Sequence, residues 1–251
     1  MKCFERVLLP FLLQNIGDLL DPLQFAYRAR RGVEDATLCV LNSLYKHLET
    51  PKSYARIMFV DFSSAFNTIQ PHLLVRKLID MNVNASLINW ISNFLTNRTQ
   101  SVRINSHHSS TATISTGAPQ GCVLSPLLFI IYTNDCVAND SCCSLVKFAD
   151  DAALVALLHG SNEDGYRSEI QNLSHWCQDN YLQINVKKTK EIIIDFRNRE
   201  SSVKPVYVND TAVEIVSEYK YLGTIIDDKL NWTTNTENVY KKCQQRLHFR
   251  S

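Results

Sequence analysis

Residues 144–157 read SLVKFADDAALVAL, two apolar runs of strand length that meet only at the adjacent acids Asp150 and Asp151. Two such runs joined by a short polar connection are typical of a β-hairpin. The pattern predicts a tight hairpin, Phe148-Ala149-Asp150-Asp151, which presents both carboxylates at its tip. An Asp-Asp pair is also compatible with a plain polar turn, so the neighbouring motifs have to decide its role.

A third acid ends another apolar run, Arg56-Ile57-Met58-Phe59-Val60-Asp61-Phe62. Asp61 follows a predicted buried strand and could simply cap the next helix. If Asp61 instead lies beside the acidic hairpin, three carboxylates cluster, and such like charges oppose joint ionisation unless a cation lies among them. Oxygen ligands suit Mg²⁺ or Mn²⁺, and two such ions about 3.5–4 Å apart assist phosphoryl or nucleotidyl transfer. The cluster therefore indicates polymerase chemistry.

A glycine-rich decapeptide, Gly117-Ala118-Pro119-Gln120-Gly121-Cys122-Val123-Leu124-Ser125-Pro126, lies between these two motifs in the chain. It predicts a turn that opens a helix, with Ser125 as the N-cap and Pro126 at the first helical position. The alternative is an ordinary loop-to-helix junction whose glycines serve packing only.

The motifs together resemble the reverse transcriptase domain of non-LTR (LINE-type) retrotransposons, in particular the jockey-like elements. The resemblance covers nearly the whole chain, and the shared order of six blocks carries it. The blocks are residues 24–28 (QFAYR) with 31–36 (RGVEDA), 59–66 (FVDFSSAF), 117–126, 148–151, Trp176, Asn180 and Leu182 with 185–190 (NVKKTK), and 219–223 (YKYLG).

The resemblance implies a role for each of the three acids. Asp61 and Asp150 match the principal metal ligands of the family, whereas Asp151 contributes less directly, and the Phe62 carbonyl would complete a metal shell. Phe66 matches the aromatic residue that crowds the sugar 2′ position, which would favour deoxyribonucleotides. The alternative for Phe66 is a phenylalanine of the core.

Further positions match nucleotide contacts of the family. Gln120 matches the glutamine that touches the incoming nucleotide and the template, and Gly121 lets the backbone come close. Lys188, in the Asn-x-x-Lys-Thr block, matches a lysine that donates hydrogen bonds to phosphate oxygens or acts as a general acid to the pyrophosphate leaving group. Lys190 is the alternative for this role. This basic run, residues 187–190, is also compatible with a solvated face.

Two more segments match the approach of nucleic acid. Arg28 and Arg31 lie before a predicted helix, in a block that lines the template and nucleotide approach of the family's fingers; exposed solubilising arginines are the alternative. Tyr221-Leu222-Gly223 resembles the hairpin that grips the primer end.

The composition is that of a folded domain, with 45% hydrophobic and 20% charged residues over 251 positions. The net charge of +1 shows no overall excess of basic residues, so any basic surface that binds nucleic acid has to be local. Eight cysteines without a Cys-x-x-Cys motif indicate neither a zinc ribbon nor a redox pair, and they favour a reducing, intracellular setting in nucleus or cytoplasm. The start of the chain lacks the features of a secretory signal, and no apolar run reaches the roughly 20 residues that cross a membrane.

The coarse pattern predicts an α+β fold, a polymerase right-hand palm with partial fingers and the beginning of a thumb. We expect partial fingers over residues 1–52, a palm with an inserted segment over 53–196, and primer-grip hairpins with the start of a thumb over 197–251. Helices are predicted around 4–20, 35–49, 71–81, 85–96, 125–136, 163–180 and 235–249. Strands are predicted around 54–61, 100–105, 111–116, 144–149, 152–157, 190–196, 205–208 and 218–226. Arg197 to Lys204 is the most linker-like stretch.

These expectations define an RNA-directed DNA polymerase that takes an RNA template, a DNA primer, dNTPs and two Mg²⁺ or Mn²⁺ ions, without a membrane. The resemblance further implies a chain cut at both ends, whose missing fingers and thumb another chain would have to supply. One rival is a catalytically silent remnant that binds RNA or protein. The other is an RNA-copying viral polymerase, against which Phe66 and Ala149 argue.

Overall fold

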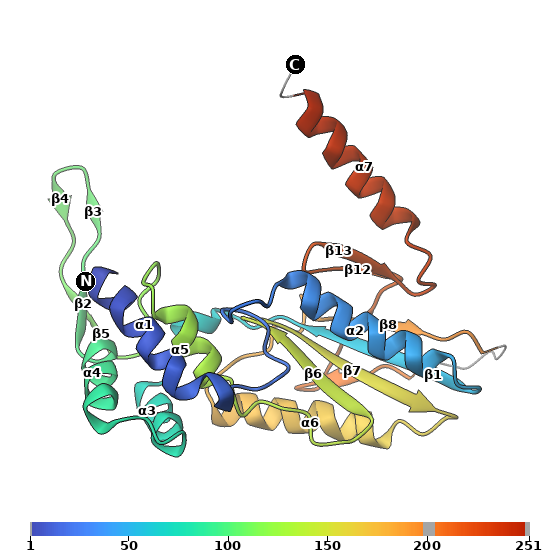
Figure 1. Cartoon of the computed structure of the whole chain (residues 1–251), viewed down its shortest axis with the longest axis horizontal. Coiled ribbons are helices and arrows are strands. Elements are labelled where there is room, and N and C mark those ends of the chain that lie inside the picture. Colours follow the sequence, from blue (N-terminus) through green and yellow to red (C-terminus); the bar gives the residue numbers. More distant parts are fainter. Residues whose placement is uncertain (1, 198–203, 249–251) are drawn as a thin grey trace.

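A five-stranded sheet forms the centre of the computed structural model, which describes residues 2–197 and 204–248 (Figure 1). Its strand order is β11-β8-β1-β7-β6. Neighbouring strands run antiparallel, except that β11 is parallel to β8. The strands are β1 (Ser53–Val60), β6 (Cys143–Phe148), β7 (Asp151–His159), β8 (Lys190–Ile194) and β11 (Glu214–Ile215).

Both faces of this sheet are covered, because side chains alternate between the two sides of each strand. On one face Ile57 and Phe59 pack with residues of α2 (Val33–Leu48). On the other face Met58 and Val60 join a second cluster that includes residues of α6 (Asp164–Asp179). Strand β1 is consequently buried along its whole length, as its unbroken apolar run requires.

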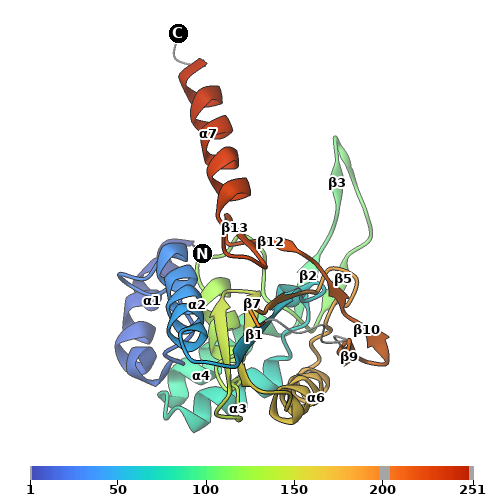
Figure 2. The ribbon, with the colours of Figure 1, turned by 90° about the vertical axis from the view of Figure 1, so that its right-hand side faces the viewer.

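A group of helices closes one end of the sheet (Figures 1 and 2). They are α1 (Lys2–Ile16), α3 (Pro71–Asp80), α4 (Ala85–Leu95) and α5 (Ser125–Tyr132), with the short 3₁₀ turns η1 (Gly17–Leu19) and η2 (Ala65–Asn67). Residues 127–132 of α5 are all buried. The glycine-rich decapeptide therefore leads into the centre of this helical group.

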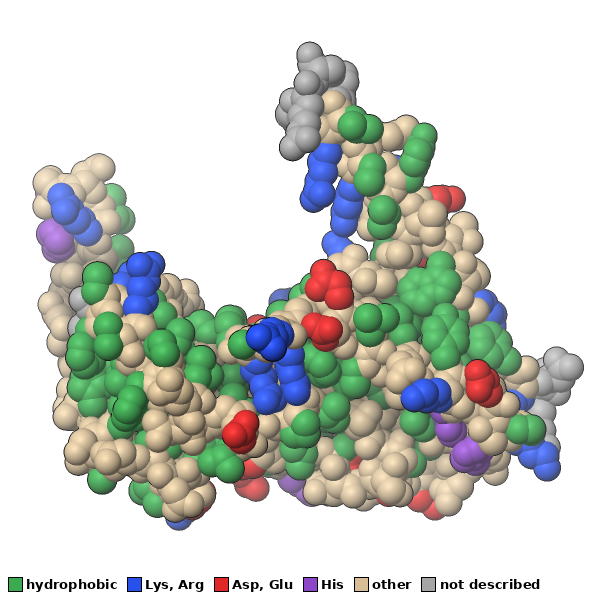
Figure 3. Space-filling model, viewed as in Figure 1, with side chains coloured by type: hydrophobic (Ala, Val, Ile, Leu, Met, Phe, Trp, Pro, Cys, Tyr) green, Lys and Arg blue, Asp and Glu red, His purple; other side chains and the backbone are tan. Residues whose placement is uncertain are grey.

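Two elements project from the body and leave a hollow between them (Figure 3). One is a long hairpin, here called the arm (residues 98–114), in which β2 (Arg98–Gln100) pairs with β5 (Ala112–Ile114) and β3 (Arg103–Ile104) pairs with β4 (His107–His108). The other is α7 (Thr233–His248).

Two small hairpins complete the fold. One joins β9 (Tyr207–Val208) to β10 (Thr211–Ala212), and the other joins β12 (Glu218–Tyr221) to β13 (Thr224–Asp227). In the second hairpin the turn residues Leu222 and Gly223 have φ values of 47° and 94°. Two consecutive positive φ values are the signature of a type I′ turn, so the predicted strand over 218–226 is in fact a hairpin.

The predicted α+β class is confirmed, and every predicted helix is present within a few residues of its expected bounds. The predicted Ser125 N-cap is wrong, because α5 begins at Ser125 itself and its hydroxyl donates to the Pro119 carbonyl at 2.6 Å. The buried Glu5 carboxylate instead holds the loop just before the helix, where its Oε2 accepts from the backbone N–H groups of Val123 and Leu124 at 2.7 and 3.2 Å. Pro10 lies inside α1 without ending the helix.

Several other expectations refer to organisation rather than to single elements. The edge strand of the central sheet, β11, lies after residue 196, where the predicted palm ends. The division of the chain into fingers, palm and thumb stays a prediction. Most of the linker predicted over Arg197 to Lys204 lies outside the described residues. The eight cysteines form no disulfide within the described structure. Among its helices, none is both long and apolar enough to cross a membrane.

Candidate active site

The strand register brings Asp61 to the acidic hairpin. Val60 and Ala152 form the last residue pair between β1 and β7, so the adjoining residues, Asp61 and Asp151, lie at the same end of the two strands. Asp150 occupies the turn between β6 and β7, and Phe148 pairs with Asp151 across it. Three acids from two distant parts of the sequence therefore gather at one end of the sheet.

The hairpin tip is held in an unusual backbone conformation. Ala149, the first residue of the two-residue turn, has a φ of 57°, a region that residues with a Cβ seldom occupy. Its N–H donates to Gln24 Oε1 at 3.2 Å, and the same oxygen accepts from Ala26 N–H at 3.0 Å. The buried Gln24 thus anchors the turn. Sequence reasoning assigned Gln24 no role, although it lies in the first family block.

The electrostatics of the three acids follow from their proximity. Desolvation raises the pKa of Asp151, and the negative charges of Asp150 and Asp61 raise it further. In the part of the chain that the structure describes, the one basic side chain paired with any of them is Lys188, whose Nζ lies 3.9 Å from Asp61 Oδ2. The Lys188 side chain is 70% exposed, so its charge is well screened. The acids therefore form a cluster with little internal compensation.

The backbone around Asp61 is fixed by the lysine-rich block. The Asp61 carbonyl accepts from Asn185 N–H at 2.8 Å, and the Asp61 N–H donates to Thr189 Oγ1 at 3.3 Å. Ser63 N–H donates to the Gln183 carbonyl at 2.8 Å. Asp61 does not cap a helix: η2 begins four residues later, and its N-cap residue Ser64 makes no side-chain cap.

Phe62 lies between these two anchored residues, in an isolated bridge with Ile184. Since the hydrogen bonds on either side of the bridge are made by Asp61 and Ser63, the Phe62 carbonyl points away from Ile184. Across the described residues, no hydrogen bond ends on this carbonyl oxygen. It remains available as a ligand beside the acids.

Three tyrosines surround the acidic cluster. Burial, followed by the charges of Asp151 and Asp61, raises the pKa of Tyr219, and burial with Asp150 does the same for Tyr27. Burial and Asp151 raise the pKa of Tyr221 strongly. The Tyr219 ring stacks on Phe59 at 4.3 Å, which fixes the predicted primer-grip hairpin against β1. Tyr27 and Tyr219 lie in blocks that carry the resemblance, yet sequence reasoning assigned neither of them a role.

The residues predicted to contact the nucleotide lie on the segment that follows Asp61 and on the glycine-rich loop. The Phe66 ring packs on Phe129 of α5 at 4.8 Å and is half-buried. Gln120 is exposed, and its Nε2 donates to Asn67 Oδ1 at 3.3 Å. Gly121 has a φ of 74° with open space where a Cβ would lie. The close backbone contact occurs instead at Gly117, where a Cβ would lie 2.8 Å from the Asn67 carbonyl oxygen.

The four candidate cations differ in their partners. Lys188 faces Asp61, whereas Lys190 Nζ pairs with Glu214 and the Lys187 carbonyl. Arg28 donates to the Asp21 carbonyl at 2.8 Å and to the Gly17 carbonyl at 3.3 Å. Arg31 donates to the Pro22 carbonyl and lies over the Phe25 ring. Both arginines therefore fasten their own loop, and their contact with nucleic acid stays a prediction.

The donors at this site suit a hard divalent cation, because they are carboxylate oxygens with a free carbonyl oxygen beside them. In the described ranges, however, no three His, Cys, Asp or Glu side chains converge closely enough to enclose an ion. The three acids therefore form an open cluster that does not by itself surround a metal ion.

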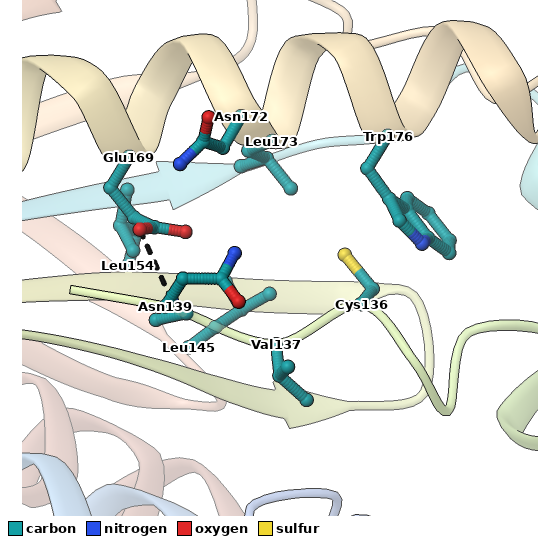
Figure 4. A pocket seen from close by; sticks show the side chains of 10 residues that line it. Cys136, Val137, Asn139, Leu145, Leu154, Glu169, Asn172, Leu173 and Trp176 are labelled. Carbon is teal, nitrogen blue, oxygen red and sulfur yellow. Dashed lines mark hydrogen bonds between the residues drawn. The ribbon is translucent and has the colours of Figure 1, made fainter.

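A separate cavity of about 40 Å³ lies between α6 and the sheet, and none of Asp61, Asp150 and Asp151 lines it (Figure 4). Glu169 closes one side of it by accepting from the N–H groups of Asn139 and Asp140, both at 3.1 Å. This volume suits one or two water molecules, so the cavity is a feature of packing.

A helix-covered sheet with acids at one end is the architecture of a polymerase palm. The family model described as "Reverse transcriptase (RNA-dependent DNA polymerase)" matches residues 1–226. The chain belongs to this family. A second model, "Alkylated DNA repair protein alkB homolog 8, N-terminal", matches only residues 232–249.

Similar proteins include mobile-element polymerases of Drosophila melanogaster. The RNA-directed DNA polymerase from mobile element jockey is 26% identical over 258 residues, covering 98% of this chain and 28% of that protein. The probable RNA-directed DNA polymerase from transposon BS is 25% identical, with the same coverage of 98% and 28%. The predicted resemblance to non-LTR retrotransposon polymerases is therefore confirmed, and the chain spans 28% of the length of these curated relatives.

The solved structures with this fold include telomerases of Candida tropicalis. An apo telomerase truncated from its C-terminal domain has a TM-score of 0.60 at 16% identity, covering 90% of this chain and 44% of that one. A telomerase in complex with a TWJ fragment of telomeric RNA has a TM-score of 0.61 at 15% identity, covering 91% and 37%. At this identity the likeness establishes the fold alone.

Proposed function

We propose that this chain catalyses RNA-directed DNA synthesis, the transfer of a dNTP to a primer 3′-hydroxyl on an RNA template. The observation that carries the proposal is the cluster of Asp61, Asp150 and Asp151, three acids with little internal compensation among the described residues, at the end of a reverse transcriptase fold. Carboxylates whose charges oppose one another are stable together when a ligand supplies positive charge.

Asp61 and Asp150, with the Phe62 carbonyl and a lesser contribution from Asp151, would hold Mg²⁺ or Mn²⁺. When bound, such ions polarise phosphate oxygens and activate the attacking hydroxyl. Lys188 lies beside Asp61, where an ammonium can neutralise the phosphate charge that develops on the leaving group. The anchored backbone at Asp61 and Ala149 keeps these groups in position before substrate arrives.

The remaining predicted contacts belong to the same proposal. Phe66 would exclude a 2′-hydroxyl, Gln120 and Gly121 would contact nucleotide and template, and Tyr221-Leu222-Gly223 would hold the primer end. Discrimination between dNTPs and ribonucleotides tests the role of Phe66, because a smaller side chain, as in Phe66→Val, would admit the ribonucleotide.

The experiment is extension of a labelled DNA primer on an RNA template with Mg²⁺ and dNTPs. The test variant is Asp150→Asn with Asp151→Asn, and the control is Asp210→Asn, an exposed aspartate in the turn between β9 and β10. We expect the double variant to lose at least about a thousandfold in rate, because several kcal/mol of transition-state stabilisation disappear, while the control stays active. Extension that survives in the double variant would overturn the proposal, and folded protein that never extends would favour the silent, RNA- or protein-binding alternative.

A further inference from the structure

Residues 21–28, here called the anchor segment, lie along strand β6 close to the acidic turn. Gln24 forms a parallel bridge with Lys147, and the backbone N–H and carbonyl of Lys147 are both hydrogen-bonded to the segment at 2.8 Å. Ala149 follows Lys147 by two residues. The bridge therefore brings the Gln24 side chain to the turn that carries the acids.

The anchor segment is itself firmly held by a buried ion pair. Lys147 Nζ lies 2.8 Å from Asp21 Oδ2, and the two side chains are 4% and 6% exposed. Arg28 donates to the Asp21 carbonyl at 2.8 Å. Either charge of a buried pair would be costly without the other, so the pair resists separation. Gln24 is thus attached to a rigid support.

One oxygen of Gln24 holds two backbone positions next to residues of unusual conformation. Gln24 Oε1 accepts from the N–H groups of Ala149 and Ala26 at 3.2 and 3.0 Å. Ala149 has a φ of 57°, and Tyr27, which follows Ala26, has a φ of 56°. Such strain in residues with a Cβ persists only where surrounding contacts maintain it. Gln24 supplies such a contact at the residue directly before Asp150.

The other half of the same amide has no partner. Gln24 is 1% exposed, and its Nε2 is buried without a hydrogen bond within the ranges that the structure describes. An unpartnered buried donor costs stability. Methionine has a similar length but no oxygen for the two N–H groups. Glutamate would keep an acceptor but would add a fourth carboxylate beside Asp61, Asp150 and Asp151. Glutamine is the side chain of this length that presents an uncharged oxygen to the turn.

We infer that Gln24 is a positioning residue for the proposed reaction. Its uncharged oxygen holds the turn at Ala149 against the mutual repulsion of the three acids, and so keeps the Asp150 carboxylate in place before a cation or a substrate binds. The inference rests on the proposed function, in which Asp150 helps to bind Mg²⁺ or Mn²⁺. Groups that orient metal ligands contribute about 10–100-fold to metal affinity or activity.

The test compares Gln24→Met with Tyr166→Phe. Gln24→Met removes the acceptor and keeps the length of the side chain. Tyr166 is also fully buried and donates to Glu191 at 2.6 Å, so Tyr166→Phe removes a buried hydrogen bond outside the acidic cluster. The first readout is hydrogen exchange of the Ala149 amide in the metal-free chain. The second is Mn²⁺ affinity, measured by electron paramagnetic resonance with RNA template, dNTP and a primer that lacks its 3′-hydroxyl.

We expect Gln24→Met to speed exchange of the Ala149 amide by at least about tenfold, because this N–H loses its buried acceptor. Mn²⁺ affinity and the single-turnover rate of primer extension should each fall by about 10–100-fold. Tyr166→Phe should change none of the three. Glycine adopts positive φ freely, so Gln24→Met should weaken Mn²⁺ binding clearly less when Ala149→Gly is also present.

Equal Mn²⁺ affinity of Gln24→Met and Tyr166→Phe would overturn the inference, as would a loss on Gln24→Met that Ala149→Gly leaves unchanged. If Gln24→Met does not fold, the unmodified chain still decides, because an Ala149 amide that exchanges like an unprotected one would refute the anchor.

A separate comparison distinguishes this inference from the proposed function. If Asp150→Asn with Asp151→Asn leaves Mn²⁺ binding intact, the proposed function falls, whereas the exchange of the Ala149 amide still reports on the turn. If that double variant loses Mn²⁺ binding and Gln24→Met does not, only the role of Gln24 falls.

Discussion

Two groups of charged residues lie on strand β1 and its neighbours, and they are built in opposite ways. In the middle of the strand, the fully buried Arg56 meets Glu191 through two bonds, of 2.9 and 2.7 Å, and Glu163 through one of 2.8 Å. Tyr166 also donates to Glu191 at 2.6 Å. Just past the end of the strand, the one basic partner that the described ranges give the three acids is Lys188, 3.9 Å from Asp61.

The pKa shifts express the same contrast. Burial alone would raise the pKa of Glu163, but bonds from Arg167 and Arg56 outweigh it, so that pKa is lowered. The pKa of Asp151 is raised by desolvation and by its acidic neighbours. The Arg56 network is complete within the protein, which is typical of a structural role. The acidic cluster is incomplete within the protein, which indicates a cationic ligand.

The largest effect on stability should come from Arg56→Ala. The substitution leaves the buried Glu191 without its counter-charge, whereas Glu163 keeps Arg167, so we expect the free energy of unfolding to fall by about 3–5 kcal/mol. Arg76→Ala, at an exposed arginine of α3, is the control and should change it little. Urea unfolding measures both variants. A loss below about 1 kcal/mol for Arg56→Ala would contradict the structural role of the Arg56 network.

The two lysines near the cluster should differ in catalysis. Lys188→Ala removes the cation beside Asp61 and should lower the primer-extension rate by about a hundredfold, the scale of general acid catalysis. Lys190→Ala breaks a pair with Glu214 and should affect the rate much less. Single-turnover extension with saturating substrates separates this from binding. The opposite order of effects would assign the role to Lys190.

The smallest effect is a pH dependence of opposite sign at the two sites. Because the folded pKa of Asp151 is raised, its favourable contribution is present below the unfolded carboxyl pKa of about 3.9 and is lost as pH rises through the folded value. Asp151→Asn should therefore gain stability relative to the unmodified chain as pH rises from about 4 to 7 without divalent cations.

Glu163 has the opposite sign, since its lowered pKa contributes stability above the unfolded value that is lost as pH falls through the folded one. Glu163→Gln should therefore lose stability relative to the unmodified chain over the same rise. Unfolding curves across this range check both signs. A parallel pH response of the two variants would contradict the contrast between the sites.

The sequence predicted correctly those elements whose structure depends on residues close together in the chain. The hairpin at Asp150 and Asp151, the buried strand before Asp61 and the helix after Gly117 all follow from periodicity and turn residues. The two-residue strands β4, β10 and β11 were missed, because pairs of this length carry no period. The local pattern around Leu222 and Gly223 predicts one strand because it lacks a polar turn signal, and only the family resemblance implied a hairpin there.

Contacts between distant residues were not predictable from one sequence. Glu5 binds the loop before α5 from more than a hundred residues away, and Arg56 meets Glu191 across 135 positions. Lys188 and Lys190 are alike in sequence, and their partners distinguish them: Asp61 for Lys188, and Glu214, from strand β11 beyond the predicted linker, for Lys190. The resemblance to reverse transcriptases supplied the grouping of the acids, which their local patterns left open.

The most direct measurement is Mn²⁺ binding followed by electron paramagnetic resonance. The chain is supplied with an RNA template, a primer that lacks its 3′-hydroxyl, and dNTP, so that no synthesis occurs. The account predicts that the unmodified chain and Asp210→Asn bind Mn²⁺ alike, and that Asp150→Asn with Asp151→Asn binds at least about tenfold more weakly. Equal binding by all three proteins would contradict the claim that the uncompensated acids form a site for a divalent cation.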